Sequence, residues 1–311
     1  MIYDKYAFKV PECKQVRVIT DTDAKNEADD QFCIVQTLLS PKVDNVGFIA
    51  AHFGLWHYED SMMRSYRELE KVFDIMGFDK KDMIFKVADK PLAPTASPYY
   101  LPKPEDSEGA RLIIREAMKD DPRPLFVTFL GPITDLASAY LIEPRIAGRL
   151  TAIWIGGGKY PEGGLEFNGN NDIAAANVIF GSNIDLWQVP QNAYEYMTVS
   201  FAELEAKVRP CGKIGKYLFD QMMEHFAENA SGSDSFRSGE TWVLGDNPAI
   251  GLILYEHRCH YDIISAPLMD SEMHYIHSGR NRGIRVYKWL DSRLILEDMF
   301  SKIKLFAEKQ G

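Results

Sequence analysis

Five acidic residues fall within ten positions near the start of the chain: Asp21, Asp23, Glu27, Asp29 and Asp30. They stand where an apolar stretch at 16–20 gives way to an amphipathic pattern at 31–39. So much negative charge in one place lowers stability unless a cation compensates it, and oxygen ligands suit calcium or magnesium better than zinc. Asp29 and Asp30 alone would fit the acidic first turn of a helix. Asp21 and Asp23 precede that helix and gain little from its dipole, which favours a metal site.

Three later segments place polar groups at the ends of expected strands or the starts of expected helices. The stretch 125–131 breaks at a Gly-Pro pair, which leaves the Leu130 carbonyl available to a hard cation. Glu166 and Asn168 would point the same way from an extended segment and suit sugar hydroxyls. Asp246 begins an apolar helical run. Each segment taken alone is also explained as a turn or a helix cap, so its functional interpretation depends on the acidic segment.

Short β-rich stretches alternate with amphipathic ones up to about residue 190. This alternation predicts an α/β fold with an open, mostly parallel, Rossmann-related sheet and helices on both faces. The expected strands are 16–20, 45–52, 84–88, 125–131, 151–156, 184–189, 261–264 and 285–289. The expected helices are 29–39, 59–77, 107–119, 132–141, 172–180, 201–208, 212–229 and 246–255. Ligands bind such sheets at the carboxyl ends of the strands, where the acidic segment lies.

Size and composition indicate an ordinary globular protein of 311 residues, with 46% hydrophobic and 26% charged residues. This length allows one large α/β domain or two. The net charge of −10 argues against nucleic acid or an anionic membrane as the main partner. The four cysteines lack metal-site spacing, which favours a reducing compartment. Since no signal-peptide core or bilayer-spanning stretch is evident, we expect a cytoplasmic protein.

In their order along the chain, these segments resemble the inosine-uridine nucleoside hydrolase family. The family's Asp-x-Asp-Pro-Gly-x-Asp-Asp cluster is similar to 21–30 here, where the spacer is two residues longer and lacks Pro-Gly. The stretch 130–137 resembles its Gly-Pro-Leu-Thr-Asn turn. The stretches 156–158, 166–168 and 172–176 match its Gly-Gly-Gly, Ala-Glu-Phe-Asn and Asp-Pro-x-Ala-Ala segments. The resemblance covers nearly the whole chain and implies a single domain over residues 1–311.

The resemblance implies a calcium ion held by four groups: Asp23, Asp30, the carbonyl of Leu130 and Asp246. It implies that Asp23 also acts as the general base, and that Asp29, Glu166 and Asn168 hold ribose hydroxyls. The implied substrate is a small ribonucleoside-like molecule. Water would attack its anomeric carbon through an oxocarbenium-like state and invert that centre.

Two departures from the family pattern concern the substrate. The Asn that usually follows the Gly-Gly-Gly turn is absent, and Asn26, Lys159 or Asn170 could supply its ribose contact. Gly245 stands where the family has a His that contacts the leaving base. His52 is the first candidate to replace it. His57, Trp56 and Tyr58 follow the strand expected at 45–52, close to the expected mouth of the site. Three residues before Gly245 are further possible contacts: Arg237, Glu240 and Trp242.

Two other functions stay open at this point. The same metal site could serve a different glycoside. The longer spacer between Asp23 and Asp29, and Gly245 in place of the family's His, leave open which leaving group the pocket accepts. The chain could also be a non-catalytic ribose or nucleoside-binding protein, although Asp23 argues against it, since binding needs no base beside a metal. By analogy with relatives, we expect a homodimer or homotetramer.

Overall fold

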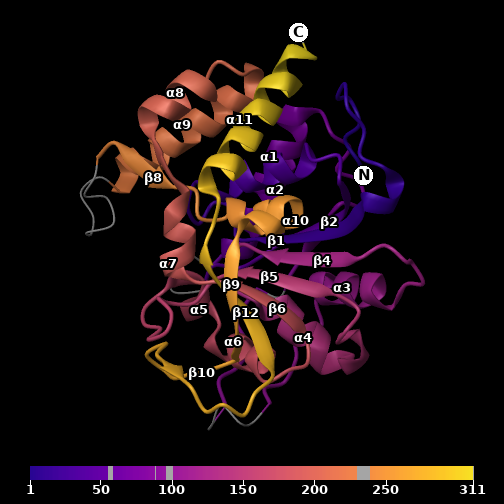
Figure 1. Cartoon of the computed structure of the whole chain (residues 1–311), viewed down its shortest axis with the longest axis vertical. Helices are drawn as coiled ribbons and strands as arrows, with labels where there is room; N and C mark the ends of the chain where they lie inside the picture. The colour runs from indigo at the N-terminus through magenta and orange to yellow at the C-terminus, as the bar shows by residue number, and fades with distance from the viewer. Residues whose placement is uncertain (55–58, 88, 96–100, 230–238, 311) are drawn as a thin grey trace.

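A computed structural model describes the chain apart from residues 55–58, 88, 96–100, 230–238 and 311. Its centre is an eight-stranded sheet in the order β3-β2-β1-β4-β5-β6-β12-β9 (Figure 1). The strands of this sheet are β1 (Val16–Thr22), β2 (Val43–Ala50), β3 (Ile84–Lys86), β4 (Leu125–Phe129), β5 (Thr151–Ile155), β6 (Asp185–Val189), β9 (His260–Ser265) and β12 (Gly283–Trp289). Neighbouring strands are parallel except for the antiparallel pair β9 and β12. The expected open, mostly parallel α/β sheet is confirmed.

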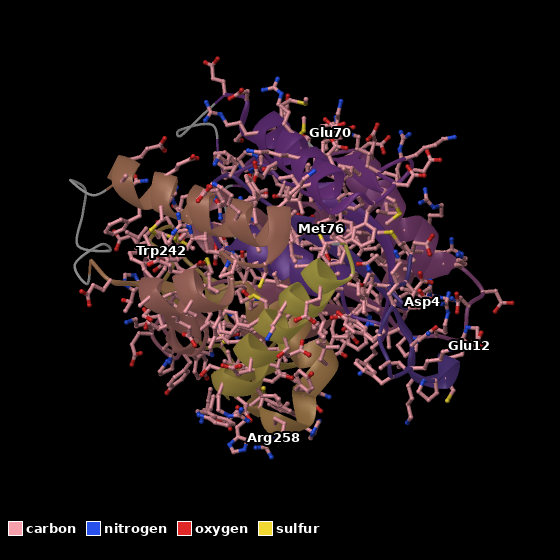
Figure 2. All side chains as sticks on the ribbon, turned by 90° about the horizontal axis from the view of Figure 1, so that it is seen from above. Asp4, Glu12, Glu70, Met76, Trp242 and Arg258 are labelled. Atoms are coloured by element: carbon pink, nitrogen blue, oxygen red, sulfur yellow. The ribbon has the colours of Figure 1, made fainter. Side chains whose placement is uncertain are left out.

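Helices cover both faces of the sheet, and each face has its own apolar core (Figure 1). One layer contains α1 (Asp30–Leu38), α2 (Ser61–Met76), α8 (Phe201–Lys207), α9 (Gly212–Asn229), α10 (Asn247–Tyr255) and α11 (Ser292–Glu308). The other contains α3 (Glu108–Met118), α4 (Thr134–Ile142) and α6 (Ile173–Phe180). Two short helices, α5 (Phe167–Asn171) and α7 (Gln191–Tyr194), follow β5 and β6. Figure 2, viewed from above, shows the helices of the first layer side by side.

Several elements differ from the expectations. The strand expected at 125–131 ends at Phe129, so Leu130 already belongs to the turn before α4. The helix expected at 172–180 is preceded by α5, and the Asp172 carboxylate caps α6 by accepting from the Ala175 N–H. The helix α11 and two small antiparallel pairs were not expected. These pairs join β7 (Thr198–Ser200) to β8 (Thr241–Val243) and β10 (Leu268–Met269) to β11 (Tyr275–Ile276). Strands of two or three residues are too short to show a periodic pattern.

The topology brings distant segments to one edge of the sheet. The strands β1, β4 and β5 are parallel neighbours, so the turns that follow them lie at the same edge. The start of α10 approaches this edge from the first helix layer and contacts α1, β4 and β5. Within the described residues, none of the helices combines the length and apolar character that crossing a lipid bilayer requires.

Candidate active site

The acidic segment forms a loop between β1 and α1. The strand ends at Thr22, and a turn follows in which the Asn26 N–H donates to the Asp23 carbonyl at 2.9 Å. Lys25 in this turn has a φ of +82°, a left-handed conformation. The helix α1 then begins at Asp30. As a result the acids of this segment are held at the carboxyl end of β1, an interior strand of the sheet.

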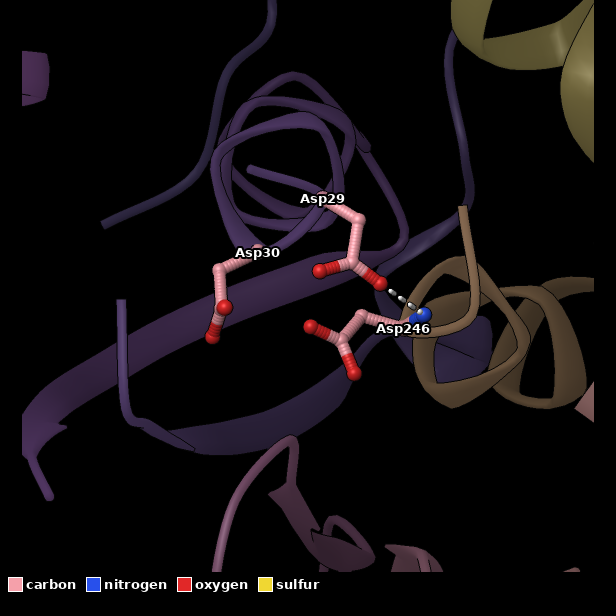
Figure 3. Close-up of side chains that lie close together, drawn as sticks. All are labelled: Asp29, Asp30 and Asp246. Carbon is pink, nitrogen blue, oxygen red and sulfur yellow. Dashed lines mark hydrogen bonds between the residues drawn. The ribbon is translucent and has the colours of Figure 1, made fainter. Parts of the chain in front are cut away.

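Three carboxylates from two distant segments meet beside this loop. Asp29, Asp30 and Asp246 each offer an oxygen that lies within 4.8 Å of the others, and all three residues are buried (Figure 3). The Asp29 carboxylate accepts a hydrogen bond of 3.2 Å from the Asp246 N–H, and the Thr22 hydroxyl donates to Asp30. Asp246 occupies the N-cap of α10, yet its side chain makes no capping bond within the described residues. The simple capping interpretation of Asp246 therefore does not account for its carboxylate.

Asp23 and Leu130 line the same cavity as these carboxylates. The Asp23 side chain is 1% exposed, and its Oδ2 has no hydrogen-bond partner among the described residues. The turn after β4 packs directly on it, because a Cβ built on Gly131 would lie 2.7 Å from the Asp23 Cγ. The four groups expected to hold a metal thus surround one cavity. A buried carboxylate oxygen without a partner is a group that a cation would satisfy.

Glu166 and Asn168 reach the cavity from the start of α5. The Glu166 carboxylate accepts from the N–H groups of Gly157 and Gly169 at 2.7 and 2.8 Å. The Asn168 amide donates to the Leu130 carbonyl at 2.7 Å and to the Ile155 carbonyl at 2.9 Å. Both side chains are therefore held in place by the backbone of the neighbouring strand ends.

Of the other candidate substrate contacts, only some line the cavity. Asn26 lines the cavity, whereas His52, Lys159 and Asn170 are not among its lining residues. The His52 ring is fully buried, with Nε2 3.0 Å from the Thr134 hydroxyl and Nδ1 accepting from the Gly54 N–H. Burial lowers the pKa of His52 to about 4, so it is neutral at physiological pH. We therefore leave His52 out of the proposed substrate contacts. The candidates Trp56, His57, Tyr58 and Arg237 lie outside the described residues.

Sequence analysis assigned no role to five residues that line the cavity, and two of them, Glu27 and Tyr194, are polar; the five are Glu27, Ile155, Phe167, Tyr194 and Val243. Tyr194, at the end of α7, donates to Glu166 at 3.4 Å and packs over Gly245, whose added Cβ would lie 3.2 Å from the tyrosine ring. No sequence pattern marks a lone tyrosine in this irregular segment. Glu27 belongs to the acidic segment but received no role. Glu27 lines the cavity, and its carboxylate accepts from the Trp242 indole N–H at 2.6 Å.

Comparison with known proteins identifies the family. The model of the inosine-uridine preferring nucleoside hydrolase family matches residues 18–293. The chain belongs to this family. It is also 33% identical over 91 residues to the inosine-uridine preferring nucleoside hydrolase of Crithidia fasciculata, a match that spans 28% of this chain and 28% of that relative.

Solved structures of nucleoside hydrolases share the fold. The purine-preferring ribonucleoside hydrolase from Gardnerella vaginalis aligns with a TM-score of 0.76 at 18% identity, over 94% of this chain and 99% of that one. The inosine-uridine preferring nucleoside hydrolase from Bacillus anthracis aligns with a TM-score of 0.65 at 16% identity, over 95% and 100%. The chain is thus a member of a family of hydrolases that act on N-glycosyl compounds, with the fold of that family.

The electrostatics of the nucleoside hydrolase cavity favour a bound cation. Burial, reinforced by neighbouring carboxylates, raises the pKa of Asp23, Asp30 and Asp246 well above the usual value. Burial also raises the pKa of Asp29, to about 6, although backbone N–H groups act in the opposite direction. Such shifts measure how poorly the negative charges are compensated. A divalent cation with oxygen ligands fits this donor set.

Proposed function

We propose that this protein is a calcium-dependent hydrolase that cleaves the N-glycosidic bond of a ribonucleoside or a similar ribosyl compound. The products would be the free base and ribose. The observation that carries this proposal is the convergence of Asp23, Asp30 and Asp246 on one cavity at the carboxyl ends of the strands, in a chain of this family.

The residues that would hold calcium are Asp23, Asp30, Asp246 and the carbonyl of Leu130. Their oxygens are hard donors, and the unpartnered Asp23 Oδ2 together with the close approach of Asp30 and Asp246 supports this assignment. Asp29 belongs to the same carboxylate group and would hold a ribose hydroxyl from beside it. Calcium, when bound, would lower the pKa of a water molecule and help to hold it for attack.

The side chains around the cavity would share the remaining chemistry. Asp23 would accept the proton of the attacking water as general base. Glu166, Asn168 and Asn26, together with Asp29, would hold the ribose hydroxyls. As the bond to the base breaks, positive charge develops on the sugar ring, and the surrounding carboxylates stabilise it. Water that attacks opposite the departing base inverts the anomeric centre.

Asp23→Asn tests the proposal. The variant keeps the shape of the side chain but cannot act as a base, so kcat for base release should fall at least about 100-fold. Release would be measured on a panel of nucleosides with added calcium, and circular dichroism would verify the fold. Asp74→Asn, an exposed acid that pairs with Lys80, is the matched control and should keep full activity. Absence of turnover by the unmodified protein on the whole panel, or full activity of Asp23→Asn, would refute the proposal.

A further inference from the structure

The cavity is unusually rich in carboxyl groups. Six line it: Asp23, Glu27, Asp29, Asp30, Glu166 and Asp246. Among the described residues that line it, none is a lysine, an arginine or a histidine. One divalent cation would compensate only part of this negative charge. The remainder must be balanced by the substrate or by protons.

Glu27 is the carboxyl group that the proposed reaction leaves unused. It does not belong to the group formed by Asp29, Asp30 and Asp246. Its carboxylate is instead fixed on the cavity wall by the Trp242 indole. Trp242 is 8% exposed and packs against Phe226 of α9, with ring centroids 6.3 Å apart, beside the first helix layer (Figure 2). A buried aromatic ring thus fixes the carboxyl group of a residue that lines the cavity. Burial, reinforced by the neighbouring Asp29, raises the pKa of Glu27 well above its usual value, because its negative charge is poorly compensated.

The cavity that Glu27 lines also contains an aromatic ring, that of Tyr194. Tyr194 and Val243 line the cavity together with Glu27, and the Tyr194 hydroxyl donates to a second carboxylate of the wall, Glu166, at 3.4 Å. Burial and the adjacent Glu166 raise the pKa of the Tyr194 phenol above its usual value, so it keeps its proton. Tyr194 is therefore a poor proton donor to a leaving base. An aromatic ring beside a carboxylate is instead a combination that binds organic cations.

The need for a proton donor depends on the charge of the leaving base. A neutral base leaves as an anion unless an acid protonates it. A base that is already a cation, such as a pyridinium or an N-alkylated purinium, leaves as a neutral molecule and needs no acid. We propose that the preferred substrates are ribosides whose base carries a positive charge, and that Glu27 and the Tyr194 ring face that base. This inference rests on the proposed hydrolase function and specifies its substrate class.

The reaction balances without a further reactant. A bond forms between the water oxygen and the anomeric carbon, and the bond from that carbon to the ring nitrogen breaks. The electron pair of the broken bond stays on the nitrogen and neutralises the base. The water proton passes to Asp23, which later releases it to solvent. Ribose and the neutral base are the products.

Glu27→Gln tests whether the negative charge of this side chain, and not its size or shape, favours cationic bases. The variant removes the negative charge but keeps a carbonyl oxygen that can accept from the Trp242 indole. We would measure kcat/KM for nicotinamide riboside, whose base is a permanent cation, and for uridine, whose base is neutral. Glu195→Gln is the matched control, because Glu195 adjoins Tyr194 but pairs with Lys159 and is not a lining residue. Binding of 1-methylnicotinamide and of neutral nicotinamide would be measured by calorimetry on the same proteins.

The unmodified protein should cleave nicotinamide riboside at least about tenfold more efficiently than uridine. Glu27→Gln should lower this ratio about tenfold, as expected for losing one nearby charge, whereas Glu195→Gln should leave it unchanged. Equal cleavage of the two substrates, or a ratio insensitive to Glu27→Gln, would overturn the inference while leaving the hydrolase function intact. A selective loss of uridine cleavage in Glu27→Gln would also overturn it, because that is the signature of an acid that protonates neutral bases.

If no riboside is cleaved, the calorimetric binding of 1-methylnicotinamide and nicotinamide still tests whether the cavity has a subsite for cationic bases. The hydrolase function then fails, but tighter binding of 1-methylnicotinamide than of nicotinamide, abolished by Glu27→Gln, would still support a subsite for cationic bases. Equal binding of the two molecules would overturn that subsite as well. Circular dichroism and tryptophan fluorescence would verify that the variants are folded.

Discussion

Asp29 illustrates at the residue scale how one carboxylate can serve two parts of a site. The resemblance to nucleoside hydrolases implies that it binds a ribose hydroxyl. In the structure it accepts the N–H of Asp246 and stands within 4.8 Å of the oxygens of Asp30 and Asp246. This backbone bond holds Asp29 beside the proposed metal ligands. A sugar hydroxyl bound there would lie next to the ion.

Calcium should stabilise the protein more at pH 8 than at pH 5. The pKa of Asp29 is about 6 in the folded protein against an ordinary value of 3.8, so the folded state binds more protons between these values. The stability of the metal-free protein therefore falls as pH rises through this window and stays low above it. Calcium replaces the missing protons at high pH and competes with them at low pH.

Thermal unfolding with calcium or with a chelator, at both pH values, measures this effect. Saturating calcium should raise Tm by about 5 °C at pH 8 and by clearly less at pH 5. The same rise at both pH values would show that buried carboxylates do not form the calcium site.

At the scale of elements, the site depends on how closely the turns after β1 and β4 approach each other. The Leu130 N–H donates to the Asp21 carbonyl at 2.9 Å, which continues the pairing of the two strands into their turns. Gly131 then lies directly on Asp23 and leaves no room for a side chain. The position of the proposed base is thus set by a neighbouring strand and not only by its own loop.

Gly131→Ala should reduce activity more than stability. The added Cβ would lie 2.7 Å from the Asp23 Cγ, so the carboxylate must move. Displacing a reacting group by about 1 Å can lower kcat about 100-fold. Gly181→Ala is the control, because its Cβ would meet its nearest neighbour at an ordinary 3.4 Å. Steady-state kinetics and thermal unfolding of both variants would be compared, and unchanged kcat in Gly131→Ala would contradict this account of the turn.

At the scale of the whole molecule, a buried polar network ties α11 to the elements that carry the site. The Lys302 ammonium donates to Asp298 at 2.6 Å and to Ser40 at 2.8 Å. Gln36 of α1 donates to the same Asp298 carboxylate and accepts from Asn247, the residue after Asp246. The C-terminal helix therefore supports the start of α10 from outside the cavity.

Asp298→Ala should destabilise the protein by about 3 kcal/mol, because it leaves the buried Lys302 charge without its partner. Glu297→Ala on the same helix should cost less than about 1 kcal/mol, since Glu297 forms a partly exposed pair with Lys207. Urea unfolding would measure both. If the two losses are equal, the network contributes no more than a surface ion pair.

The oligomeric state also belongs to the scale of the whole molecule. We expect sedimentation to show a homodimer or a homotetramer. A monomer at micromolar concentration would contradict this expectation.

The sequence alone determined the fold class and most of the cavity. Alternating β-rich and amphipathic stretches are local patterns, so they predicted the parallel sheet and the ends of its strands. The acids of the β1 turn, Leu130, Glu166, Asn168 and Asp246 each follow a strand or begin a helix, which is why their positions could be read from the chain. The cytoplasmic location stays a prediction.

Only the tertiary structure decided which side chains face each other. His52 follows a strand as the site residues do, yet its ring turns into the core toward Thr134. Tyr194 carries no local signal, and Trp242 was expected only as a possible substrate contact. Both act through contacts with residues distant in sequence, Gly245 and Glu27. Local periodicity specifies where a residue sits on its own element, whereas contacts between elements depend on packing across the whole chain.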